Sequence, residues 1–189
     1  MGHSFGGAFT EILLDRGMGA AGVAIDPAPV KGVVKLPLSS LRSSFPVLKN
    51  PTNTHKAVML SPDEFHYSFT NTLSEEDSRA AWERYAVPGP GRVLFQGVLA
   101  NFNPHAETRV DFENPERAPL LIIGGGVDHV IRASVTEDVA DKYKHSPTKT
   151  DYKEFPGRSH FTVGQPGWEE VADYALTWAA AAAKAPTTA

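Results

Sequence analysis

A serine with the neighbours of a nucleophile stands close to the start of the chain. Residues 2–6 read GHSFG, a G-x-S-x-G pattern with Ser4 at its centre. In this pattern the serine occupies a sharp turn between a strand and a helix, and the turn exposes its hydroxyl. A serine hydroxyl reacts poorly at neutral pH unless a base takes its proton and an acid orients that base. The pattern therefore predicts a nucleophile that needs a histidine and a carboxylate from elsewhere in the chain.

The acid and the base are expected just beyond later strands, because ligands of open parallel sheets bind at the carboxyl ends of the strands. Asp128 follows the apolar and glycine-rich run 119–126, and His160 follows the alternating segment 150–155. The order serine, aspartate, histidine along the chain is one that serine hydrolases use. We therefore predict that Asp128 orients His160 and that His160 takes the proton of Ser4.

Other residues compete for these roles. Asp26 ends an earlier strand and is the alternative acid, while His129 and His145 are expected to be solvated loop residues. His160 is preferred because it alone lies in a Gly-x-x-His-aromatic turn after the last strand. No histidine spacing matches a usual metal site, and no Lys-Ser pair follows the glycines at 124–126 as a phosphate loop requires. We therefore predict neither a metal nor a cofactor.

The segments around these residues have the periodicity of alternating helices and strands. Apolar residues at Phe9, Ile12 and Leu13 have helical spacing, and Gly17 is a plausible end of that helix. The short apolar run 20–25 is typical of a buried parallel strand. The other core elements that we predict are a strand over 119–126, a helix over 134–143, an edge strand over 150–155 and a closing helix over 168–183 before an Ala/Pro/Thr tail.

Residues 30–118 differ in character, with many prolines, aromatics and polar residues. A capping box at Ser61 predicts a helix that continues to residue 70, and Ser74 caps a second helix that runs through residue 85. A weaker helical pattern covers 93–101. We therefore predict three parts: hydrolase core over 1–29, a mainly helical cap inserted over 30–118, and the rest of the core over 119–189.

Bulk composition excludes several classes of protein. The 189 residues suffice for one domain, and 18 basic and 22 acidic residues give a net charge of −4 without a basic stripe for nucleic acid. No apolar run approaches the roughly 20 residues that span a bilayer. The chain has no cysteine, which excludes disulfides and a thiol nucleophile. Without a visible signal peptide we expect a cytoplasmic protein, although a segment before Met1 could have carried a signal.

Taken together, the motifs make the chain similar to the α/β-hydrolases that carry a helical cap. GHSFGG at 2–7, GGGVDH at 124–129 and GRSHF at 157–161 match the family, and the resemblance covers essentially all of the chain. It implies a truncated α/β-hydrolase fold, with a mostly parallel sheet, helices and an inserted cap. It also implies roles for the three side chains: Ser4 is the nucleophile, His160 is the general base and then the acid, and Asp128 fixes the imidazole tautomer.

The resemblance further implies that the backbone N–H of Phe5 is one oxyanion donor. Complete members of the family have several strands and helices before the serine turn, including the strand that leads into it and the loop with the second donor. We expect these to be absent here, so that the strand over 20–25 exposes an open edge through which two copies of the chain could pair. A start site placed inside a longer reading frame explains the departure most simply.

The activity that the resemblance implies is hydrolysis of small-molecule carboxylic esters through an acyl-enzyme. Cleavage of C–C bonds or cofactor-free perhydrolysis on the same scaffold is one alternative, and a non-catalytic fragment that associates with another chain is a second, of a different class. Aromatic residues of the cap are expected to line an acyl pocket, the alternative being that they form the cap's own small core. The substrate-binding residues that we predict are His3, Phe65, Phe69, Trp82 and Phe102.

Overall fold

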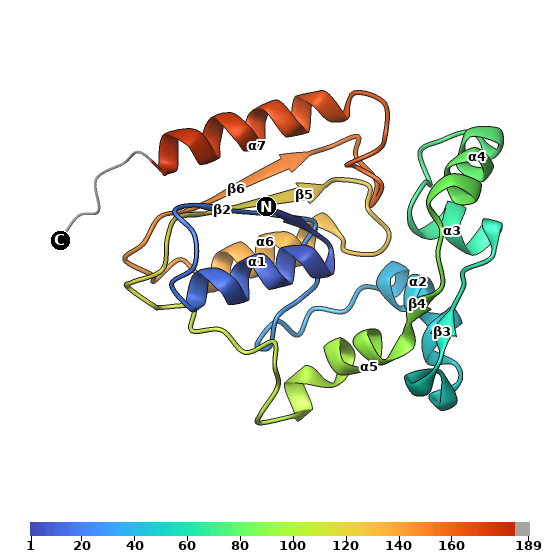
Figure 1. The fold of residues 1–189 in the computed structure, drawn as a ribbon, viewed down its shortest axis with the longest axis horizontal. Coiled ribbons are helices and arrows are strands. Elements are labelled where there is room, and N and C mark those ends of the chain that lie inside the picture. Colours follow the sequence, from blue (N-terminus) through green and yellow to red (C-terminus); the bar gives the residue numbers. More distant parts are fainter. Residues whose placement is uncertain (184–189) are drawn as a thin grey trace.

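Four parallel strands form the central sheet of the computed structural model, which describes residues 1–183 (Figure 1). In spatial order they are β1 (Gly2–His3), β2 (Gly22–Ile25), β5 (Leu120–Gly125) and β6 (Thr150–Phe155). Every neighbouring pair is parallel, so the carboxyl ends of all four strands meet at one edge. The mostly parallel sheet with flanking helices that the sequence predicts is thereby confirmed, as is the position of β6 at the sheet's edge.

Helices cover both faces of the sheet. Helices α1 (Phe5–Asp15) and α6 (Ala133–Lys142) lie on one face, and α7 (Trp168–Ala182) lies on the other (Figure 1). The side chains of β5 point alternately to the two faces of the sheet. Leu120 and Ile122 pack in the cluster with α1 and α6, whereas Leu121 and Ile123 pack with α7. Because both faces are covered, β5 can be apolar at every side-chain-bearing position, and its residues are buried throughout.

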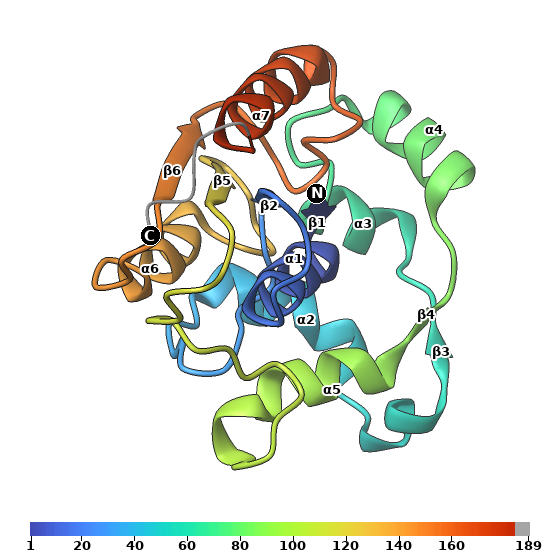
Figure 2. The same ribbon diagram turned by 60° about the vertical axis from the view of Figure 1, so that its left-hand side comes forward.

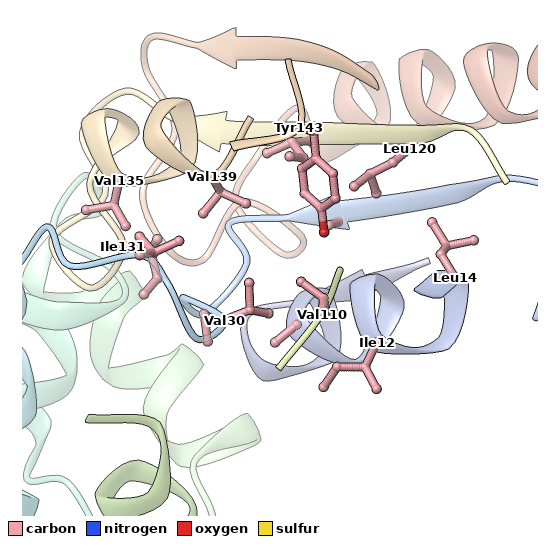
Figure 3. Packing of buried hydrophobic residues seen from close by; sticks show 14 residues of the cluster. Ile12, Leu14, Val30, Val110, Leu120, Ile131, Val135, Val139 and Tyr143 are labelled. Carbon is pink, nitrogen blue, oxygen red and sulfur yellow. The ribbon is translucent and has the colours of Figure 1, made fainter. Parts of the chain in front are cut away.

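The larger apolar cluster fills the space between the sheet and helices α1 and α6 (Figure 3). Ile12 and Leu14 enter it from α1, and Val135 and Val139 enter it from α6. Tyr143, just past α6, is also buried there. This packing fixes α1 against the strands, and with it the turn from which α1 begins.

The ends of the core helices follow the sequence signals. Gly17 has φ +72°, a left-handed conformation that favours glycine, and its N–H donates to the carbonyl of Leu14 as α1 ends. The closing helix is also present, as α7. The Ala/Pro/Thr tail predicted after it falls on residues 184–189, which lie outside the described part of the chain.

The helical part of the segment predicted to be an insertion, residues 38–102, lies beyond the carboxyl ends of the strands (Figures 1 and 2). The rest of it runs back beside α1, where the side chain of Asn114 donates to the carbonyl of Asp15 and Val110 joins the core. Three of its helices match the predicted ones: α3 (Pro62–Ser68) with the capping box of Ser61 and Glu64, α4 (Glu75–Tyr85) capped by Ser74, and α5 (Gly91–Leu99). Its other elements are α2 (Leu38–Leu48), the 3-10 turns η1 (Pro51–His55) and η2 (Ala100–Phe102), and the two-residue strands β3 (Ala57–Val58) and β4 (Gly89–Pro90), which pair antiparallel.

Two features were not expected from the sequence. Helix α2 contains four serines and Pro46, which are weak helix formers, so its sequence does not predict a helix. Tertiary packing stabilises it instead. The strand that leads into Ser4 is present in part, as β1, which pairs Gly2 with Ala24 and His3 with Ile25. The expectation that β2 would be an open edge is therefore only half right. Strand β1 lies at the edge and pairs with Ala24 and Ile25, while Gly22 and Val23 have no strand partner on that side among the described residues.

Candidate active site

Ser4 lies on the turn between β1 and α1. Its backbone angles, φ 55° and ψ −121°, are ones that non-glycine residues rarely adopt, and such strain collects at functional sites. Two backbone hydrogen bonds to the end of β2 and the loop after it hold this turn. The N–H of Ser4 donates to the carbonyl of Ile25 at 2.9 Å, and the carbonyl of Ser4 accepts from the N–H of Ala28 at 2.9 Å. The serine hydroxyl is thereby fixed at the carboxyl end of the sheet.

Close backbone contacts explain the glycines around this serine. A Cβ on Gly2 would overlap the carbonyl of Gly6, and a Cβ on Gly7 would lie 2.8 Å from Cα of Pro27. Gly6 is different, since no described atom comes within 4 Å of the Cβ it lacks. Packing therefore requires glycine at Gly2 and at Gly7, but not at Gly6.

His160 and Asp128 come together with Ser4 at this edge. Nε2 of His160 lies 3.0 Å from Oγ of Ser4, and Nδ1 lies 2.6 Å from Oδ2 of Asp128. The other carboxylate oxygen of Asp128, Oδ1, accepts the backbone N–H groups of Val130 at 2.6 Å and Ile131 at 2.9 Å. Both His160 and Asp128 are fully buried. The geometry therefore joins the three side chains in one chain of hydrogen bonds from hydroxyl to carboxylate.

Electrostatics favour a basic imidazole at His160. Burial by itself would lower the pKa of His160, but the charge of Asp128 and the hydrogen bond that its carboxylate accepts from the imidazole raise that pKa above the ordinary value. Asp26, in its ionised form, adds a smaller effect that also raises the pKa of His160. A base of this kind, hydrogen-bonded to a hydroxyl and to a carboxylate, can take the hydroxyl proton as that oxygen attacks an electrophile.

Asp26 occupies the same cluster without a hydrogen bond to His160. It is fully buried at the end of β2, and its Oδ1 accepts the backbone N–H of Gly125 at 2.6 Å. Burial, and then the charge of Asp128, raise the pKa of Asp26 to about 8. Its other oxygen, Oδ2, is buried without a described partner and lies 4.0 Å from Nε2 of His3. Asp26 thus ties β2 to the turn that carries Asp128.

His3 packs behind the catalytic candidates. Its ring centroid lies 4.7 Å from that of His160, and burial, with the nearby charge of His160, lowers the pKa of His3 to about 3. His3 is therefore neutral near pH 7, and its approach to Asp26 is not an ion pair. His3, Asp26 and His160 also place one potential ligand atom each within 4.8 Å of one another, which no sequence spacing indicated. Both ring nitrogens of His160 already have partners, so a metal there would have to displace Ser4 or Asp128.

The competing histidines lie elsewhere. His129, in the loop after β5, is half-buried and its Nδ1 lies 2.8 Å from the carbonyl of Tyr67 on α3, so the expectation that it is solvated is wrong. His145 is exposed, as expected. The predicted oxyanion donor, Phe5, is the first residue of α1, so its N–H has no acceptor within the helix. The positive end of the α1 dipole adds to this donor, since helix N-termini stabilise negative charge.

Two cavities open beside Ser4. We call the first, of about 300 Å³, the aliphatic cavity; it is bordered by loop 28–36 and helices α2, α5 and α6. We call the second, of about 440 Å³, the aromatic cavity; it is bordered by α2, α3, α5 and the β3–β4 pair, and His160 lies on its wall. The residues that border both cavities are Ser4, Phe5, Ser44, Leu94 and Val130.

The predicted substrate-binding residues fall into three groups. Phe65 and Phe69 line the aromatic cavity, and Phe102 lines the aliphatic one. Trp82 and His3 line neither cavity: the indole N–H of Trp82 donates to the carbonyl of Leu60 at 2.9 Å, inside the cap. Sequence analysis missed the walls that α2 and α5 supply, although Leu94, Gly97 and Val98 have the spacing of one helix face.

No protein-family model matches the chain, and a search of curated proteins gives no match. Solved structures do resemble it. A monoacylglycerol lipase of Paleococcus ferrophilus superposes with a TM-score of 0.56 at 20% identity, covering 95% of this chain and 66% of that one. Polyneuridine aldehyde esterase gives 0.57 at 16% identity over 94% of this chain and 69% of the other, and a thermophilic esterase gives 0.51 at 20% identity over 94% and 65%.

At these identities the likeness concerns the fold, and this chain spans about two thirds of the length of those structures. The order of elements agrees with that likeness, because the serine turn, the aspartate turn and the histidine turn follow β1, β5 and β6 of one parallel sheet. None of the helices in residues 1–183 has the length and apolar character needed to cross a bilayer. From the serine turn onward, the chain has the α/β-hydrolase fold.

Proposed function

We propose that this chain carries the site of a serine hydrolase that cleaves carboxylic esters through an acyl-enzyme. The observation that carries the proposal is the line of hydrogen bonds from Ser4 through His160 to Asp128. The names of the structurally similar lipase and esterases agree with it at the level of reaction class. The apolar cavities on either side of Ser4 suit an uncharged organic ester.

In the proposed reaction, Oγ of Ser4 bonds to the ester carbonyl carbon while its proton passes to Nε2 of His160. The carbonyl oxygen becomes an oxyanion that the N–H of Phe5 stabilises. The C–O bond to the alcohol then breaks, and the alcohol leaves with the proton from His160. Water next attacks the acyl-enzyme, its proton passes to His160, and the carboxylic acid leaves as Ser4 recovers its hydrogen.

Asp128 acts on the imidazole throughout this cycle. Its Oδ2 accepts the Nδ1 proton, which leaves Nε2 as the acceptor facing Ser4. When His160 becomes an imidazolium, the carboxylate compensates its charge in a site from which water is excluded. Val130 and Ile131 hold the carboxylate in place through its other oxygen.

The direct test is labelling with a fluorophosphonate, which reacts with activated serines. The purified chain should become labelled at Ser4, as located by peptide mass spectrometry, and Ser4→Ala should abolish labelling. His160→Ala should slow it by at least about 10³-fold, while His129→Ala should label like the unchanged chain. A folded chain that remains unlabelled at Ser4 would overturn the proposal and favour a non-catalytic role.

A further inference from the structure

The two cavities meet at Ser4 but are not equivalent, because His160 borders only the aromatic one. We infer that the aliphatic cavity binds the acyl group and the aromatic cavity binds the leaving alcohol, so that the preferred substrates are esters with a flexible aliphatic acid and a bulky apolar or aromatic alcohol. This inference rests on the proposed function and adds the direction in which the substrate lies.

The direction follows from the path of the proton. When the tetrahedral intermediate collapses, the departing alkoxide oxygen must receive a proton from Nε2 of His160. That oxygen therefore lies on the side of the carbonyl carbon that faces His160, which is the side of the aromatic cavity. The acyl chain leaves the same carbon in another direction, and the aliphatic cavity, which Ser4 also borders and His160 does not, lies there to receive it.

The walls of the aliphatic cavity suit a hydrocarbon chain. Val33, Ile131 and Val135 are buried side chains on its inner wall, and Phe102 and Val98 stand at more exposed positions. The charged side chain on its border is that of Lys35, whose Nζ donates to the carbonyl of Ser134 at 3.0 Å. Apolar surface of this kind favours apolar acyl chains by about 0.8 kcal/mol for each buried methylene.

Gly97 is a position from which this cavity can be narrowed. It lies on α5 and on the cavity wall, and a Cβ there would lie 3.4 Å from the ring of Phe5, at ordinary contact distance. A methyl group therefore fits at this position, but the rest of a larger side chain has to extend into the cavity. Glycine in a helix interior disfavours the helix by about 1 kcal/mol relative to alanine, so a larger residue here fills the cavity without weakening α5.

The aromatic cavity is built differently. The rings of Phe65 and Phe69 stack with centroids 5.2 Å apart, and the rings of Phe69 and His160 are nearly perpendicular with centroids 5.0 Å apart. Tyr85 and Val87 stand on its border, and Val87 is 76% exposed. Flat aromatic surfaces next to the proton donor suit a ring-bearing alcohol, since aromatic pairs gain energy beyond the area they bury. Its larger volume agrees with a bulkier group.

The experiment compares one variant for each cavity on two series of esters. One series varies the acyl chain from acetyl to decanoyl with a single alcohol, and the other varies the alcohol from methyl to naphthyl with a single acyl group. Gly97→Leu should lower kcat/KM for the longest acyl chain relative to acetyl by at least about 10-fold and leave the alcohol preference unchanged. Val87→Trp should act only on the alcohol series. Gly97→Ala and Val87→Ala are the matched controls, and circular dichroism checks folding.

A binding measurement tests the assignment of the two cavities without relying on catalytic turnover. In the Ser4→Ala chain, octanoate binding measured by calorimetry should weaken with Gly97→Leu and not with Val87→Trp, and 2-naphthol should show the reverse. The exchanged pattern, or equal effects of both variants on both ligands, would overturn the inference. If the Ser4→Ala variants bind as expected but the chain with Ser4 intact is not labelled, the proposed function is refuted, and only the preference of each cavity for its ligand stands.

Discussion

Replacing Asp128 by asparagine tests which carboxylate orients the imidazole. The amide keeps an oxygen that can accept the N–H groups of Val130 and Ile131, so the turn itself should persist. Its NH₂ group then faces Nδ1 of His160, where Oδ2 now accepts a proton at 2.6 Å. Two donors cannot face each other, so Nδ1 becomes the acceptor and the proton moves to Nε2. The imidazole then presents a donor to Ser4 and cannot take its proton.

The magnitude follows from the loss of the correct tautomer, which in a triad of this geometry costs about 10⁴ in kcat, equivalent to about 5.5 kcal/mol at 1.36 kcal/mol for each factor of ten. Asp26→Asn should behave differently. The pKa of Asp26 is raised to about 8, so this carboxyl is mostly protonated at pH 7 and asparagine is close to it in charge and shape. Its amide oxygen can still accept the N–H of Gly125. We therefore expect a much smaller loss of rate from Asp26→Asn than from Asp128→Asn.

The assay is the second-order rate of fluorophosphonate labelling at Ser4, together with kcat/KM for an activated ester, for the unchanged chain and both variants. Thermal unfolding of each variant establishes that the comparison concerns folded protein. If Asp26→Asn lowers both rates as much as Asp128→Asn or more, the role assigned to Asp128 is wrong and Asp26 is the orienting acid.

Three further predictions concern acidity and backbone strain. Activity should rise with pH through a midpoint above 6.5, because the pKa of His160 is raised, and Asp128→Asn should move that midpoint to lower pH in a pH–rate profile. Burial raises the pKa of Glu11, which accepts a hydrogen bond from Tyr143, from 4.5 to about 8. Between these pH values Glu11 is ionised in the unfolded chain and protonated in the folded one, so the free energy of unfolding should fall by about 1.4 kcal/mol per pH unit. Urea denaturation of Glu11→Gln should show a flatter pH dependence. Ser4→Gly should be more stable than Ser4→Ala by about 1 kcal/mol, because only glycine relieves φ 55°, and equal stability in urea unfolding would contradict strain at this turn.

Local patterns were sufficient to predict most of the core. The runs over 119–126 and 150–155 carry strand signals that do not depend on tertiary context, and β5 and β6 lie within them. Helix α2 could not be predicted in this way, because its serines and Pro46 disfavour a helix that is nevertheless held by packing against α3 and α5. The two-residue strand β1 is too short to have a periodicity of its own and is defined only by its pairing with β2.

The residues of the site also divide into those that local sequence predicts and those that depend on tertiary contacts. Ser4, Asp128 and His160 each stand in a turn with its own sequence pattern, and the fold then brings them within hydrogen-bond distance. The contacts that support them have no such pattern. The contact of Asp26 with Gly125 and the position of Gly97 beside Phe5 on a cavity wall depend on which segments the sheet and α5 bring together over 90 residues or more of sequence.

The way in which Ser4 is held bears on how much of a larger sheet the site needs. The sequence suggested that the serine turn depends on a full strand preceding Ser4. The described contacts, however, come mainly from residues that follow it in the chain, at the end of β2 and just beyond. The backbone N–H and C=O of Ser4 bond to Ile25 and Ala28, and β2 in turn pairs with β5, which leads to Asp128. Asp26 closes the connection through its bond to Gly125. The backbone connection from nucleophile to acid therefore runs through β2 and β5, whose side chains are buried on both faces. The histidine that completes the line follows β6, which pairs with β5, so the site needs all three of these strands.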